Sequence, residues 1–317
     1  MDTYSQDCWT DAQWTQIQEA VRDEAKQHRV AASFLPLSGG VPEDAQTVPL
    51  QTLNLRPDPA NPGTDFLEVN DFDTRRLTTL SVRVSLGTSQ VAQQDLSAAI
   101  VAFRRAANLI ARAEDFLVLF MSTRQNAPLP GLNPALATGG DFFDGLFTTA
   151  VNRRQTVSMT AMAALPPPPG PGNGEPLVRA VSNAIGQLEA NGHLGPFALV
   201  LNTRLFDVAH TPDPGSFVLP ADRIKPLLDG PCRDGRRPSS DCRLLRSSLL
   251  NWGAPTFRGV LVSPTEDRLD LVVASEIRAR LLQITADASP RFIFRVSERF
   301  TLRIKQIEET RSRTLRQ

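Results

Sequence analysis

The chain has 317 residues, of which 41% are hydrophobic, and its 34 basic side chains balance 34 acidic ones. This apolar content excludes a disordered or fibrous chain, and the length favours about two core-bearing units. No apolar run approaches the roughly 18 to 20 residues that span a bilayer, and the N-terminal residues lack the pattern of a signal peptide. We therefore expect a cytoplasmic protein, and the zero formal charge argues against a dedicated nucleic-acid binder.

The strongest helix signal lies near the N-terminus. Thr10 and Gln13 have the spacing of a capping box, and Trp9 and Trp14 occupy the two positions of a hydrophobic staple. The helix is expected to end near His28, and it must lay its apolar stripe against another part of the protein. That stripe consists of Trp14, Ile17, Val21 and Ala25.

Residues 48–86 change to a strand-like alternation. Two alternating stretches, 53–55 and 77–86, flank a segment rich in proline, asparagine and glycine at 57–63. The pattern predicts a long two-stranded ribbon. Because an isolated ribbon is only marginally stable in water, we expect it to pack against a neighbouring structure.

Residues 89–121 form the longest helical pattern in the chain. Glu114 lies on its apolar face, where a charge requires a partner. We expect a salt bridge to an arginine at the edge of the core rather than a catalytic role.

The second half begins with an irregular, proline-rich stretch at 125–176, which we interpret as a linker or surface flap. A helix is expected from Leu177 to about Ala190, and strands at 197–202, 259–263 and 269–274. The last strand alternates apolar residues with arginines. We therefore expect one face to be buried in the core and the other to be exposed to solvent or paired with other groups. These arginines are Arg291, Arg295, Arg299 and Arg303.

Residues 291–317 contain eight basic and three acidic residues, which we interpret as a solvated strand face and tail.

The search for catalytic and metal-binding motifs is negative. No pair among the three histidines has metal-ligand spacing, and His193 and His210 are expected in exposed loops. No nucleophile elbow, phosphate-binding loop or dinucleotide fingerprint is present. Cys232 and Cys242 flank an arginine-rich loop and are expected to be free thiols in a reducing cytosol. The sequence predicts neither an enzyme nor a metal site.

Several stretches, taken in order, resemble the encapsulins, the linocin-type shell proteins of bacterial nanocompartments. The second half contributes NGHLGPFALVLNTRLFDVAH at 191–210, FRGVLVSPTEDRLDLVVASEI at 257–277 and RFIFRVSERFTLRI at 291–304. The first half contributes the connector FLPLSGG at 34–40 and the helix end AEDFLVLF at 113–120. Each motif is weak alone, and the ordered set is specific.

The resemblance implies an α+β protein with the tailed-phage major capsid protein fold (HK-ninety-seven type), built from a peripheral domain, an extended loop and an axial domain. The sequence departs from the family in the longer stretch at 125–176 and in the loop at 232–242. The implied parts are an N-terminal helix and connector (1–47), the extended loop (48–88), the peripheral domain (89–125 and 275–317), a proline-rich insertion (126–176) and the axial domain (177–274).

The resemblance also implies two kinds of site. A cargo-binding groove is expected where the N-terminal helix meets the peripheral domain, and a loop beginning at His210 is expected to ring the five-fold pore, with Asp213 and Ser216. The alternative for the helix is that its whole stripe packs within the subunit. The expected cargo-binding residues are Trp14, Ile17, Val21, Ile277 and Leu281.

We therefore expect a structural protein that self-assembles into an icosahedral shell and encloses a cargo enzyme carrying a C-terminal targeting peptide, with no nucleic-acid or membrane partner. Some encapsulins hold a flavin with a tryptophan and a tyrosine. The nearest positions here are Gln90 and Phe217, so we expect no cofactor. The alternative is a phage or prophage major capsid protein, which often carries a long scaffolding segment before its first helix.

Overall fold

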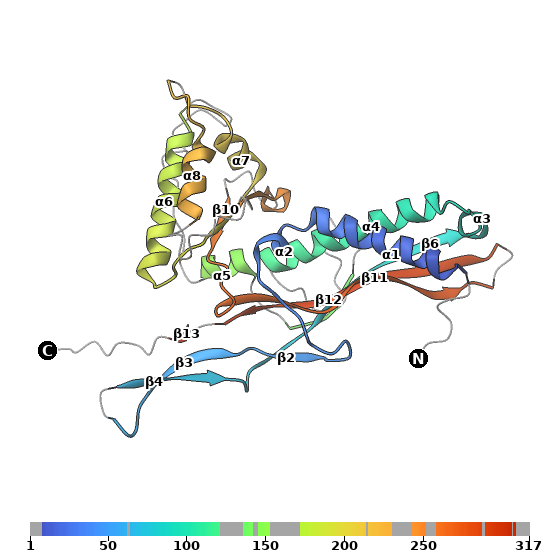
Figure 1. Ribbon diagram of the computed structural model, residues 1–317, viewed down its shortest axis with the longest axis horizontal. Coiled ribbons are helices and arrows are strands. Elements are labelled where there is room, and N and C mark those ends of the chain that lie inside the picture. The colour runs from blue at the N-terminus through green and yellow to red at the C-terminus, as the bar shows by residue number, and fades with distance from the viewer. Residues whose placement is uncertain are drawn as a thin grey trace. The chain divides into compact units, whose positions relative to one another are not determined.

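The chain forms two compact units, residues 1–143 with 266–317, and residues 144–265 (Figure 1). We call them the first and the second unit and describe each by itself. The computed structural model describes residues 8–61, 64–120, 136–141, 145–152, 172–213, 215–229, 243–251, 258–286, 289–305 and 307–308.

The first unit is built on a five-stranded sheet with the order β1-β11-β12-β6-β7, in which β1 runs parallel to β11 and the other neighbours are antiparallel. Val82 and Val84 of β6 lie opposite Val296 and Phe294 of β12, and all four side chains are buried on one face. The expected alternation of the last strand is confirmed. The strands are β1 (Leu37–Ser38), β6 (Thr78–Gly87), β7 (Leu136–Gly139), β11 (Leu269–Ile284) and β12 (Arg291–Ile304).

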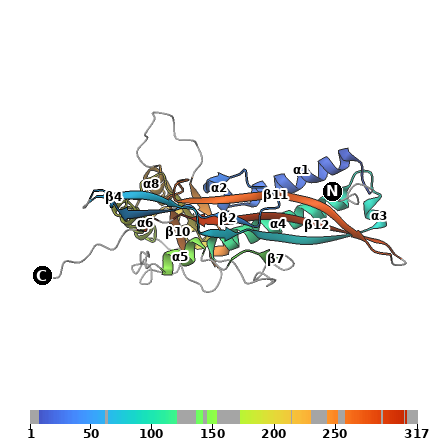
Figure 2. The same ribbon diagram turned by 90° about the horizontal axis from the view of Figure 1, so that it is seen from below.

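Helix α4 (Ser97–Leu119) packs against β6 and β12, and α1 (Asp11–His28) packs against α4 and β11 (Figures 1 and 2). The single helix expected at 89–121 is instead two, because Leu96 adopts a left-handed conformation with φ of 52° between α3 (Thr88–Val91) and α4. The short helix α2 (Ala31–Phe34) follows α1.

The N-terminal capping box and staple are both confirmed. The Gln13 N–H donates to Thr10 Oγ1 at 3.4 Å, and the Thr10 N–H donates to Gln13 Oε1 at 3.0 Å. The rings of Trp9 and Trp14 meet edge to face with centroids 5.1 Å apart. Trp9 also stacks on Phe294 at 4.8 Å, which fixes the start of α1 to the central strand of the sheet.

The predicted ribbon is shorter than expected. The hairpin consists of β3 (Thr52–Pro57) and β4 (Asp65–Asn70), with β2 (Thr47–Pro49) and β5 (Thr74–Arg76) paired at its root. The second alternating stretch, 77–86, belongs almost entirely to strand β6 of the main sheet and not to the ribbon, because its alternating apolar face packs under α4. A short strand, β13 (Ile307–Glu308), adds to β3 in parallel.

Arg303 holds the hairpin root to the sheet. Its Nε donates to Asp270 Oδ1 at 2.8 Å, and its Nη1 donates to the Pro49 carbonyl at 3.0 Å. Lys305 Nζ lies 3.1 Å from Asp270 Oδ2. The arginines of β12 were expected to be either exposed to solvent or paired, and Arg303 is paired.

The second unit has a three-stranded sheet with the order β10-β8-β9, packed against helices. The expected helix at 177–190 is confirmed and begins three residues earlier, at Gly174, and Asn191 caps its C-terminus. Helices α7 and α8 were not anticipated. The elements are α5 (Leu146–Asn152), α6 (Gly174–Ala190), β8 (Ala198–Leu201), α7 (Thr203–Ala209), α8 (Pro220–Leu228), β9 (Leu244–Arg246), η2 (Ser248–Asn251) and β10 (Gly259–Val262).

The second unit ends at Thr265. Residues 269–284 form one continuous strand, β11, within the sheet of the first unit. Most of the proline-rich insertion and both Cys232 and Cys242 lie outside the described residues.

Candidate functional site

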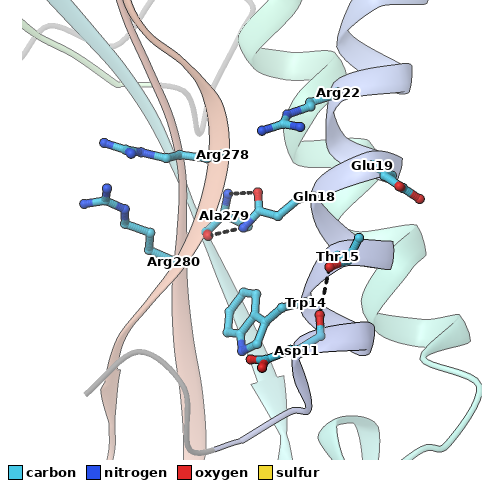
Figure 3. A pocket seen from close by; sticks show the side chains of 9 residues that line it. All are labelled: Asp11, Trp14, Thr15, Gln18, Glu19, Arg22, Arg278, Ala279 and Arg280. Atoms are coloured by element: carbon cyan, nitrogen blue, oxygen red, sulfur yellow. Dashed lines mark hydrogen bonds between the residues drawn. The ribbon is translucent and has the colours of Figure 1, made fainter. Parts of the chain in front are cut away.

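A solvent-open groove of about 490 Å³ lies between α1 and β11 in the first unit (Figure 3). Helix α1 supplies one wall and the Arg278–Arg280 segment of β11 supplies the other. In Figure 3 the side chains of Arg278 and Arg280 extend from β11 away from α1. The lining residues are Asp11, Trp14, Thr15, Gln18, Glu19, Arg22, Arg278, Ala279 and Arg280.

Gln18 joins the two walls of this groove. Its Nε2 donates to the Ala279 carbonyl at 2.7 Å, and its Oε1 accepts from the Ala279 N–H at 3.0 Å (Figure 3). On its other side Ala279 lies opposite Val296 of β12. The Gln18 amide thus hydrogen-bonds both backbone groups of one residue on the free edge of β11, as a neighbouring strand would.

The five residues expected to bind cargo do not lie together at the groove. Ile17 and Val21 are fully buried and Ile277 is 2% exposed, so these side chains belong to the core of the first unit. Leu281 is half-buried and does not line the groove. Only the half-buried Trp14 lines it. The alternative considered for the helix, that its stripe packs within the subunit, therefore holds for most of the stripe.

The polar residues of the groove were missed by sequence reasoning. Gln18 resembles any solvated helix residue in the sequence, and only its bonds to Ala279 distinguish it. Arg278 pairs through both Nη atoms with Glu43, at 2.7 and 2.6 Å. This hydrogen bonding from Arg278 lowers the pKa of Glu43, so the carboxylate stays ionised at neutral pH.

The loop expected at the pore forms a turn. Gly215 has φ of 80°, and the Ser216 N–H donates to the Asp213 carbonyl at 3.0 Å. His210 ends α7, where its ring lies over Phe206 with centroids 4.3 Å apart. His210, Ser216 and the fully exposed Phe217 face solvent.

Asp213, also expected in the pore loop, has hydrogen-bond partners within the second unit. Its carboxylate accepts from the backbone N–H groups of Gly172, Gly174 and Glu175, each at 3.1 Å, at the N-terminus of α6. A Cβ on Gly174 would lie 2.6 Å from Asp213 Oδ2 and 2.4 Å from Pro220 Cγ, so only glycine fits there. Asp213 is therefore an acceptor for the helix terminus, which favours negative charge, and not a free charge on the loop.

Among the described residues, no group of three or more histidine, cysteine or acidic side chains is placed to hold a metal ion. No described helix is long and apolar enough to cross a membrane.

The fold defines a class of protein. It is similar to the crystal structure of a virus-like particle from Pyrococcus furiosus, with a TM-score of 0.55, 14% identity, and coverage of 92% of this chain and 95% of that one. It is also similar to a structure of Mycobacterium phage Bobi, with a TM-score of 0.54, 16% identity, and coverage of 89% and 83%. The chain thus has the tailed-phage major capsid protein fold that the sequence resemblance implied.

Sequence comparison shows which family within this fold class the chain resembles. Residues 6–138 match the family described as "Encapsulating protein for peroxidase". The chain is 26% identical over 309 residues to a type 1 encapsulin shell protein of Myxococcus xanthus, covering 92% of this chain and 89% of that protein. The chain is thus similar in sequence to encapsulin shell proteins.

Proposed function

We propose that the chain self-assembles into an icosahedral nanocompartment shell and encloses a cargo enzyme that carries a C-terminal targeting peptide. The similarity to encapsulin shell proteins supports assembly into a shell. The observation that carries the proposal is the hairpin of β3 and β4. Phe72 at its root is 94% exposed, and Phe66, Leu67 and Val69 of β4 are exposed too. An exposed apolar ribbon is typical of an interaction surface, and further copies of the chain supply the cover.

In this proposal the first unit is the peripheral domain with its extended loop, and the second unit is the axial domain. The loop from His210 to Phe217 rings the five-fold pore. Because Asp213 is held at the N-terminus of α6, the side chains that line the pore are His210, Ser216 and Phe217. A particle structure that places this loop away from every symmetry axis contradicts the assignment.

The cargo peptide docks in the groove between α1 and β11. Trp14 offers an apolar surface there, and the free edge of β11 offers backbone groups to an extended peptide. Many copies of the groove in one shell make a weak single site sufficient, because a multivalent cargo gains avidity.

Two measurements test the function. The purified chain should form closed particles of uniform size in electron micrographs, and deletion of residues 57–71 should leave small oligomers or aggregates. For the cargo, Thr15→Trp fills the groove from an exposed position on α1. Co-expressed cargo should then be lost while the particles keep their size.

The matched control is Gln16→Trp, which adds the same bulk to an exposed position of α1 outside the groove. This variant should retain cargo. Equal loading of both variants would place the docking site elsewhere, and intact shells from the deletion would contradict the role of the hairpin.

The alternative function is a phage or prophage major capsid protein, which the fold shared with phage structures favours. The absorbance ratio at 260 and 280 nm separates the two, because a packaged genome raises this ratio far above that of protein.

A further inference from the structure

The C-terminal end of α1 contributes no buried side chain after Ala25. Lys26, Gln27 and His28, which complete the helix, are all exposed. The next buried side chain along the chain is Ala31, in α2. Apolar packing therefore holds this end of α1 only weakly, and polar contacts must keep it in place.

Four charged side chains make those polar contacts. Arg29, which caps α1, lies with its Nε 2.7 Å from Glu114 Oε2 of α4, and its Nη2 pairs with Glu298 of β12. Asp115 of α4 accepts from two backbone N–H groups of the α1–α2 junction, at 3.0 and 2.7 Å. We call Arg29, Glu114, Asp115 and Glu298 the carboxyl cluster. It joins the end of α1 to α4 and to the central strand of the sheet.

The carboxyl cluster contains more acidic groups than positive charges. Glu114 is fully buried, and Asp115 and Glu298 are 2% and 1% exposed, so water screens these groups poorly. Burial and the neighbouring Glu298 raise the pKa of Glu114 well above its usual range, and burial raises the pKa of Asp115 to about 7. The packed cluster therefore holds protons near neutral pH.

The neighbouring charged groups among the described residues add no buried positive charge. Burial raises the pKa of Glu298, and the nearby Glu276 of β11 raises it further. Glu276 is exposed and lies 3.9 Å from Arg22 of α1, which is exposed as well. His28 Nε2 lies 2.9 Å from Glu24 Oε1 at the surface, and α2 carries no charged residue. The protons of the cluster are thus its main source of charge balance.

Loss of these protons favours detachment of the end of α1. Detachment lets water reach the carboxylates and removes the cost of keeping them buried together. Because the packed cluster binds protons that the open one releases, the open state gains population as pH rises. The first half of α1 stays fixed, since Trp9 stacks on Phe294 and Ile17 is fully buried. The opening is therefore confined to the residues after Val21.

These residues include part of the groove wall. Arg22 lines the groove on α1, beyond Gln18 (Figure 3), and lies about two helical turns before Arg29. Movement of the segment from Arg22 to Arg29 therefore widens the groove beyond the point where Gln18 is bonded to Ala279.

We propose that the carboxyl cluster is a proton-dependent anchor for the C-terminal end of α1, which detaches at alkaline pH and widens the groove between α1 and β11. The detachment follows from the cluster alone, and only its effect on a docked cargo peptide rests on the proposed function. With that peptide in the groove, the protein holds cargo more tightly below neutral pH than above it.

Hydrogen exchange of the full chain, followed by mass spectrometry, tests the proposal. Between pH 6 and pH 9 the protection factors of residues 22–31 should fall at least about tenfold. This factor follows for a carboxyl group whose pKa is about 7 in the packed cluster and about 4 in the open one. The exchange of residues 22–31 should not depend on dilute urea, which marks a local opening, whereas exchange in β6 and β12 should.

Changes of charge test the cause of this fall. Glu114→Gln removes one carboxylate at nearly constant size, so the fall should be smaller. Asp115→Asn makes the same change of charge at the neighbouring position and should act in the same direction. The matched control is His28→Gln, because His28 also lies at this end of α1 and can lose charge as pH rises, yet it is exposed. This variant should keep the whole fall.

Several results would overturn the proposal. Exchange of residues 22–31 together with the sheet, with the same urea dependence, would show that the cluster sets only the overall stability. Constant protection in the wild type would overturn it, and so would a full fall in both Glu114→Gln and Asp115→Asn. Loss of the fall in His28→Gln would assign the pH dependence to that histidine. None of these outcomes affects the proposed shell, which electron micrographs of the wild type test separately.

Discussion

The Nε atom of Arg29 lies 2.7 Å from Glu114 Oε2 in the interior of the first unit. Arg29 also pairs with Glu298 of β12, and Asp115 accepts from the backbone N–H groups of Val30 and Ala31. The predicted salt bridge of Glu114 is confirmed. One guanidinium thus faces three buried carboxyl groups. Its single positive charge is too little for all three to be ionised without a cost in free energy.

This imbalance predicts that stability falls as pH rises. Burial and the neighbouring Glu298 raise the pKa of Glu114 well above its usual range, and burial raises the pKa of Asp115 to about 7. The folded state therefore holds protons that the unfolded state releases near pH 4. The resulting stability is present below that pH and is lost as pH rises toward 7 and above.

Glu114→Gln should remove much of this dependence. Thermal unfolding from pH 5 to pH 8 should show a falling Tm for the wild type and a flatter profile for the variant. At pH 8 the variant should unfold about 2–4 °C higher, which corresponds to about 1 kcal/mol. Glu19→Gln, on the exposed face of α1, should keep the wild-type slope. A flat wild-type profile would contradict the argument.

Ile17→Asp should prevent folding of the first unit. The side chain is fully buried between α1 and its neighbours, and an unpaired carboxylate there costs several kcal/mol. Ile17→Val should cost only about 0.5–1.5 kcal/mol. Urea unfolding of the two variants checks this difference. A folded Ile17→Asp variant that assembles normally would show that the stripe is not core.

Asp213→Ala should destabilise the second unit by about 0.5–2 kcal/mol, the range for loss of a helix N-terminal acceptor. Asp213→Asn, which keeps one acceptor oxygen, should cost less. Gly174→Ala should cost more than Asp213→Asn because its Cβ has no space. Hydrogen exchange at the first turn of α6 measures the effect locally. Unchanged protection there in Asp213→Ala would refute the capping role.

Phe72→Ser should weaken assembly without lowering the stability of the folded chain. Phe72 is almost fully exposed in the isolated protein, so its removal costs the folded state little. Buried between copies, the same side chain contributes about 1.5–3 kcal/mol. The concentration needed for particle formation should therefore rise, while the Tm of the unassembled chain stays constant. A lower Tm with normal assembly would reverse the interpretation.

Local signals in the sequence predicted local structure well. The spacing of Thr10 and Gln13 predicted the start of α1, and the alternation of residues 292–304 predicted the buried face of β12. These patterns depend on neighbouring residues, whose geometry is set by the backbone period. The two helices α7 and α8 were missed because they are short, and α8 contains Pro226 in its interior.

The candidate sites were harder to predict because they depend on contacts between distant residues. An apolar stripe such as Trp14 and Ile17 indicates that a helix face is covered, but the pattern is the same for a core and for a bound peptide. The role of Asp213 depends on its meeting Gly174, 39 residues away. No spacing rule in the sequence predicts that encounter.

The pairing of β13 with β3 has a mechanical consequence. β12 is a central strand, bonded to β11 on one side and to β6 on the other, and the chain runs from it past Lys305 into β13. A force on a protein fused to the C-terminal end would first load the short parallel pairing with the hairpin. It would then pull β12 lengthwise, so that the hydrogen bonds on both sides resist in shear together instead of opening one at a time. The hairpin root would therefore yield before the sheet.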